Sequence, residues 1–130
     1  MGENSVSVPS EKTILIVDDT PENVDILNEL LSDYNRKVAI NGKMAVKVAE
    51  KTKPDLILLD VMMPEMDGFE AAKILKANPA TSEIPVVFVT AKTDVNSFVA
   101  GFEIGAEDYI MKPFDPKVVL SAVKRKLGIE

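Results

Sequence analysis

The chain alternates short apolar runs with longer amphipathic segments. The apolar runs predict five strands, over residues 13–17, 37–40, 55–59, 85–89 and 108–111. Between and after these runs, apolar residues recur with the spacing of one helical face. This spacing predicts five helices, over residues 21–32, 43–52, 68–77, 94–104 and 115–127. Because strands that alternate with helices favour right-handed crossovers, we expect an α/β fold with a mostly parallel sheet.

The apolar runs differ in a way that predicts their place in the sheet. Residues 55–59 and 85–89 are almost wholly apolar. Strands that are covered on both faces have this composition, so we expect both runs at the centre of the sheet. The run at 37–40 is shorter and weaker, which is typical of an edge strand.

Several predicted helices begin at residues that commonly cap a helix. The candidate caps are Thr20, Asp67 with Glu70, Thr93 or Asp94, and Asp115. The fourth helix also carries a marked apolar stripe with i, i+3, i+4, i+7 spacing. Its members are Val95, Phe98, Val99 and Phe102.

Polar groups follow four of the predicted strands. They are Asp18 with Asp19, Asp60, Thr90 and Lys112. Because ligands of an open parallel sheet bind outside the carboxyl ends of its strands, we expect these groups to share one crevice. Three carboxylates in one place repel each other, and a hard cation such as Mg²⁺ removes that conflict. Each residue alone has an ordinary alternative, as a solvated strand end, a loop residue or a surface lysine, but the ordered set favours a site.

The set suits transfer of a phosphoryl group. Asp60 can act as a nucleophile towards phosphorus, as aspartate does in covalent catalysis. Lys112 and Mg²⁺ would neutralise charge on the transferring oxygens, and the Thr90 hydroxyl could donate to one of them. The backbone carbonyl of Met62 could provide a further metal ligand.

Length and composition narrow the class of protein. The 130 residues suit one domain, which we place at residues 12–128 behind a disordered lead at residues 1–11. The net charge of −6 argues against direct nucleic-acid binding, which needs a basic surface. Histidine and cysteine are absent from the sequence, which excludes imidazole and thiolate chemistry. No apolar run approaches the roughly 18 residues of a membrane span, so we expect a cytoplasmic protein with no membrane partner.

These motifs resemble the receiver domain of two-component response regulators. The resemblance covers residues 12–127, nearly the whole chain. The matching segments are residues 17–19, 60–68, 90–91 and 112–113. The resemblance implies a flavodoxin-like, doubly wound sheet of five parallel strands in the order 2-1-3-4-5, flanked by five helices.

The resemblance also implies roles for the site residues. Asp60 is similar to the phosphoacceptor of the family. Asp18 and Asp19 resemble its acidic metal pair, with Asp19 binding Mg²⁺ directly and Asp18 through water. Lys112 resembles the phosphoryl-binding lysine, which precedes a cis proline. Thr90 and Tyr109 resemble the switch hydroxyl and the switch aromatic.

Partners follow from the same resemblance. The phosphodonor would be a phosphohistidine on a histidine kinase or a histidine phosphotransfer protein. Phosphorylation would switch the surface of residues 94–127, which controls a downstream protein, an output domain or a homodimer. Residues 19–23 resemble receivers attached to signalling-enzyme outputs. Met62 and Lys92 lie where they could affect the lifetime of the phosphoryl group, and because methionine cannot orient a water, we expect slow self-dephosphorylation.

Other functions are open at this point. A phosphatase of the haloacid-dehalogenase type needs Asp-x-Asp, but Met62 stands where the second acid would be. A nucleotide-binding domain is disfavoured because neither glycine-rich phosphate motif occurs. A receiver-shaped interaction module that is never phosphorylated is the remaining alternative.

Overall fold

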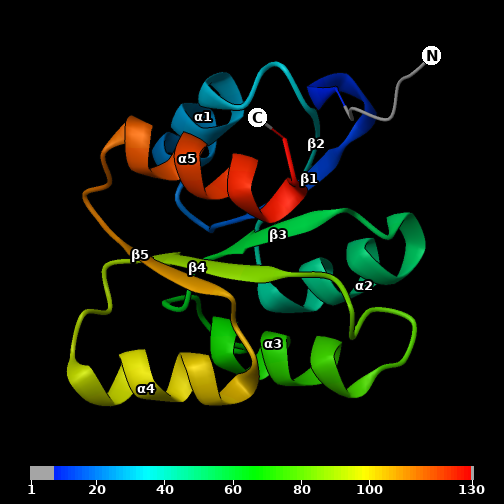
Figure 1. Ribbon diagram of the computed structural model, residues 1–130. Coiled ribbons are helices and arrows are strands. Elements are labelled where there is room, and N and C mark those ends of the chain that lie inside the picture. Colours follow the sequence, from blue (N-terminus) through cyan, green and yellow to red (C-terminus); the bar gives the residue numbers. More distant parts are fainter. Residues whose placement is uncertain (1–7, 130) are drawn as a thin grey trace.

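The fold is a five-stranded parallel sheet between two layers of helices. A computed structural model describes residues 8–129 (Figure 1). The strands are β1 (Thr13–Val17), β2 (Asn35–Ala39), β3 (Leu56–Leu59), β4 (Val86–Thr90) and β5 (Asp108–Met111). The helices are α1 (Pro21–Leu30), α2 (Gly42–Thr52), α3 (Gly68–Ala77), α4 (Val95–Ile104) and α5 (Pro116–Leu127). The strand order is β2-β1-β3-β4-β5, which confirms the predicted topology.

Each face of the sheet has its own hydrophobic core. Helices α1 and α5 cover one face, and α2, α3 and α4 cover the other (Figure 1). Successive residues of a strand point to opposite faces, so Ile14 and Ile16 pack under α1 and α5 while Leu15 and Val17 pack on the other side. Strands β1, β3 and β4 are buried almost throughout, which explains their continuous apolar composition.

The N-terminal part of the chain differs from the prediction. Residues 1–7 of the expected disordered lead lie outside the described residues. Residues Pro9–Glu11 form a short 3-10 helix (η1), so this part of the lead is ordered. Its contact with β2 gives the physical reason, because the Asn35 side-chain amide donates to the Ser10 carbonyl at 2.8 Å. Strand β2 also begins two residues before the predicted run, at Asn35.

Strand β2 was hard to delimit because its first half is polar. Asn35, Arg36 and Lys37 are exposed at the edge of the sheet. An edge strand needs no apolar residues on a solvated face, so hydrophobic patterning detects only its buried end.

Within residues 8–129, no helix has the length and apolarity to cross a membrane.

Most predicted helix caps are confirmed. Asp67 and Glu70 form a complete capping box, and Asp94 and Asp115 cap α4 and α5 through their side chains. Thr20 is the N-cap residue of α1, but its side chain makes no capping bond. The apolar stripe of α4 lies on the exposed side of that helix, while its buried side carries Ser97 and Gly101.

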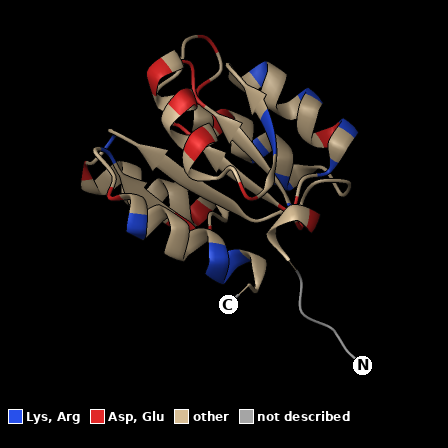
Figure 2. Cartoon of the chain, turned by 90° about the horizontal axis from the view of Figure 1, so that it is seen from above, with Lys and Arg blue, Asp and Glu red and all other residues tan. Residues whose placement is uncertain are grey.

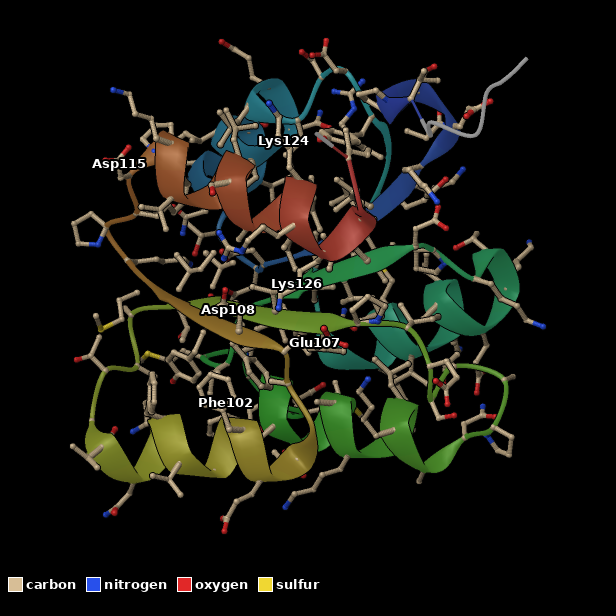
Figure 3. All side chains as sticks on the ribbon, viewed as in Figure 1. Phe102, Glu107, Asp108, Asp115, Lys124 and Lys126 are labelled. Carbon is tan, nitrogen blue, oxygen red and sulfur yellow. The ribbon has the colours of Figure 1, made fainter. Side chains whose placement is uncertain are left out.

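The two ends of α5 lie at opposite edges of the sheet. It begins at the carboxyl edge, where the parallel strands end, and it finishes at the amino edge, where they start. Asp115 starts the helix just after the carboxyl end of β5, and Lys126 near its end lies 3.8 Å from Glu107, which precedes β5 (Figure 3). Arg125 pairs with Asp108 in the same way, at 3.2 Å. The chain therefore enters β1 and leaves α5 at the amino edge of the sheet.

Candidate functional site

The predicted polar groups meet at the carboxyl edge of the sheet. Asp18 and Asp60 follow β1 and β3, which pair through Val17 and Leu59 and so place the two carboxylates side by side. Thr90 ends β4 opposite Met111 of β5, which brings Lys112 to the same edge. Asp18 is 1% exposed and Asp60 is 5% exposed.

Lys112 pairs with both buried carboxylates. Its Nζ donates to Asp18 Oδ2 at 2.6 Å and to Asp60 Oδ2 at 3.1 Å. Burial by itself would lower the pKa of Lys112, but the hydrogen bond to Asp18 and the charge of Asp60 outweigh it, so the pKa is raised. The ammonium compensates charges that would otherwise be costly to bury.

Backbone N–H groups fix the remaining oxygens of these two carboxylates. Asp18 Oδ1 accepts from the Thr20 N–H at 2.9 Å, and Asp60 Oδ1 accepts from the Met62 N–H at 3.2 Å. Each carboxylate is therefore held in one orientation, with one oxygen on the backbone and the other on Lys112.

The third carboxylate completes a group that could hold a metal ion. Asp19 is exposed, and one oxygen from each of Asp18, Asp19 and Asp60 lies within 4.8 Å of the others. Oxygen ligands partly open to water suit Mg²⁺, which keeps several waters when it binds. The Met62 carbonyl is two residues from Asp60, and its place as a metal ligand stays a prediction.

Gly68 is a site residue that the pattern analysis did not single out. A Cβ at this position would lie 2.1 Å from the Asp60 carbonyl oxygen, so only glycine fits. The Gly68 N–H donates to the Val61 carbonyl at 2.9 Å and closes the loop after β3. The signal for it was present in the sequence, since Gly68 directly follows the capping residue Asp67.

Thr90 and Tyr109 are linked through the backbone of Lys92. Thr90 is fully buried, and its Oγ accepts from the Lys92 N–H at 3.1 Å. Tyr109 is 7% exposed, and its hydroxyl donates to the Lys92 carbonyl at 2.6 Å. The peptide bond before Pro113 is cis, as the resemblance implied.

A comparison with known families and proteins agrees with this geometry. The response regulator receiver domain family matches residues 14–124. The chain belongs to this family. A relative from Vibrio cholerae, named a "probable cyclic di-GMP phosphodiesterase", is 43% identical over 91% of the chain and 27% of its own length. The DNA-binding response regulator MtrA of Mycolicibacterium smegmatis is 40% identical over 88% of the chain and 50% of its own length.

Solved receiver domains have the same fold. The receiver domain of a sensor histidine kinase from Pseudomonas aeruginosa, solved with a magnesium ion in its active site cleft, has a TM-score of 0.83 and is 28% identical. The match covers 90% of this chain and 98% of that one. The chain spans half or less of the length of the two sequence relatives, and in both the receiver is one part of a longer protein.

Proposed function

We propose that Asp60 accepts a phosphoryl group from a phosphohistidine on a histidine kinase or a histidine phosphotransfer protein. The observation that supports this most is the buried pair of carboxylates that share one ammonium at the carboxyl edge. An Asp60 oxygen attacks phosphorus, the bond between phosphorus and the histidine nitrogen breaks, and the electron pair returns to the imidazole. Asp19 and Asp60 would hold Mg²⁺ directly and Asp18 would hold it through water, and the ion would supply positive charge to offset that of the phosphoryl oxygens.

The chain's own residues position and stabilise the acceptor. Asp60 is oriented by the Met62 N–H. Lys112 lies 3.1 Å from Asp60, close enough for its ammonium to bind a phosphoryl oxygen after the transfer. The Thr90 hydroxyl would donate to one of these oxygens. To do so, the Thr90 hydroxyl would move, which would change the hydrogen bond that it accepts from the Lys92 N–H. The carbonyl of Lys92 accepts the hydrogen bond of the Tyr109 hydroxyl, so Tyr109 would be affected as well. Phosphorylation would therefore alter the surface formed by α4, β5 and α5.

The partners belong to this proposal as well. The Vibrio cholerae relative supports an enzyme output domain, since the receiver makes up only 27% of that protein. Other outputs compatible with the surface are a separate protein and a homodimer that forms on phosphorylation. The role is that of a cytoplasmic phosphoacceptor, with slow self-dephosphorylation and no turnover of small substrates. The alternative is an interaction module with this fold that never receives a phosphoryl group.

Intact-mass spectrometry after incubation with acetyl phosphate tests the proposal. We expect one phosphoryl adduct on the wild type in the presence of Mg²⁺ and none after EDTA. Asp60→Asn should abolish the adduct, while Asp115→Asn, which changes a capping acid outside the site, should leave it. If a histidine kinase and acetyl phosphate both fail to modify the wild type, the result would favour the alternative function, an interaction module that is never phosphorylated.

A further inference from the structure

Five aromatic rings form a continuous row from the core to the surface of α4. Phe69 packs against Phe88 at 5.2 Å between ring centroids, and Phe88 packs against Tyr109 at 5.8 Å. Tyr109 continues to Phe98 at 5.4 Å, and Phe98 to Phe102 at 4.9 Å. Phe102 lies at the surface between α4 and β5 (Figure 3). Tyr109 is the ring that joins the buried half of the row to the exposed half.

Gly101 lies directly against the Tyr109 ring. A Cβ at position 101 would lie 3.1 Å from Tyr109 Cδ2 and 3.3 Å from Phe88 Cδ2. Glycine is unfavourable inside a helix, yet Gly101 is in the interior of α4. Its φ is not positive, so the backbone conformation does not require glycine. What limits a side chain at this position is the space that the Tyr109 and Phe88 rings occupy.

Of the two rings that Gly101 faces, Tyr109 is the one able to move. Phe88 is fully buried and is held between Phe69 and Tyr109. Tyr109 lies next to Phe98, which is 44% exposed, so its ring has a path towards solvent. A methyl group at position 101 would therefore require the Tyr109 ring to shift outwards by a few tenths of an ångström, which would strain the hydrogen bond from its hydroxyl to the Lys92 carbonyl.

We propose that Gly101 is a positioning residue that makes room for Tyr109 to pack inwards, and that it thereby sets the balance between the inward and outward orientations of this ring. The consequence of this packing for signalling rests on the proposed function. The exposed apolar stripe of α4 depends on the same balance. When Tyr109 packs inwards it supports Phe98, and when it leaves, Phe98 loses its contact with the aromatic row.

Tyrosine fluorescence can report the position of Tyr109 directly. The chain has no tryptophan and two tyrosines, so Tyr34→Phe leaves Tyr109 as the sole tyrosine. In this background, Gly101→Ala should increase quenching of Tyr109 by acrylamide. Overpacking of a tight site should shift the inward-to-outward ratio about tenfold. Asn96→Ala is the matched control, because it adds alanine at an exposed position of α4 and should leave the quenching unchanged.

A double-mutant cycle separates packing against Tyr109 from the general benefit of alanine in a helix. In the Tyr109→Ala background, Gly101→Ala should increase the free energy of unfolding, since the gain in helix propensity is then opposed only by the 3.3 Å approach to Phe88. With Tyr109 present, the same substitution should give less stabilisation or a loss. Unchanged quenching together with the same stability change in both backgrounds would overturn the proposal. Neither measurement needs phosphorylation, so failure here is distinct from failure of Asp60 to accept a phosphoryl group.

Discussion

At the residue scale, the site is built around one ammonium shared by two buried carboxylates. Lys112 contacts Asp18 and Asp60, while backbone N–H groups hold the other oxygen of each. This arrangement orients Asp60 beside a positive charge, which suits a nucleophile that attacks phosphorus. Met62, whose N–H donates to Asp60, is 56% exposed.

The lifetime of the phosphoryl group should depend on Met62. Its thioether cannot orient an attacking water, whereas an amide at this position can donate and accept hydrogen bonds. We expect Met62→Asn to speed loss of the phosphoryl group roughly tenfold, less than the ~100-fold of a well-placed acid or base. Met62→Leu keeps an apolar side chain and should decay like the wild type. Equal decay rates for all three proteins, followed by intact mass after removal of acetyl phosphate, would contradict the assignment.

The place of the candidate site residues could be predicted because each one directly follows or ends a strand. The parallel topology alone brings Asp18, Asp60, Thr90 and Lys112 to one edge. The contacts among their side chains could not be predicted, because they depend on differences of a few tenths of an ångström in the distances between atoms. Two such contacts are the ion pairs of Lys112 with both carboxylates and the close fit of Gly68 against the Asp60 backbone.

At the element scale, α4 is the helix whose surface contradicts ordinary amphipathic packing. Val95, Phe98, Val99 and Phe102 are exposed, whereas Ser97 and Gly101 are buried, so the pattern marks a helix correctly but does not tell which face is buried. Asp94 fixes the start of this helix by accepting hydrogen bonds from the Ser97 N–H and the Ser97 hydroxyl, both at 2.9 Å. The next residue, Val95, already belongs to the exposed stripe.

The cap of α4 should weaken at acid pH. The Ser97 N–H and then the Ser97 hydroxyl lower the pKa of Asp94 below its usual 3.8. A lowered folded-state pKa means that the cap contributes fully above pH 3.8 and loses its contribution as the pH falls through the folded value. Asp94→Asn keeps a capping side chain that does not titrate. The difference in urea unfolding free energy between wild type and Asp94→Asn should therefore shrink below pH 3.8; a constant difference would exclude this role.

At the scale of the whole molecule, charge is distributed unevenly. Helix α1 carries Glu22, Asp25 and Glu29 and no basic residue, whereas α2 carries Lys43, Lys47 and Lys51 on its exposed side (Figure 2). The site adds three carboxylates and one ammonium at the carboxyl edge. The negative potential at that edge favours cations over anions.

Magnesium should therefore stabilise the entire fold. A ligand that binds only the folded state at one hundred times its Kd adds about 2.7 kcal/mol, or roughly 10 °C in Tm for a domain of this size. We expect Asp19→Asn to remove most of this shift, because Asp19 is the exposed carboxylate of the group. Thermal unfolding with Mg²⁺, with K⁺ at equal ionic strength as the control, measures the effect. The same shift in both salts would show screening rather than a site.

The pairing of α5 with the amino end of β5 has a consequence for how the domain can be joined to others. Because Lys126 and Glu107 anchor the end of α5 opposite the site, a polypeptide attached after residue 129 starts away from Asp60, as does one attached before β1. Fusions at either end would leave the approach to Asp60 unobstructed. A receiver built this way can act as an interchangeable module, with its chemistry on one edge and its connections on the other.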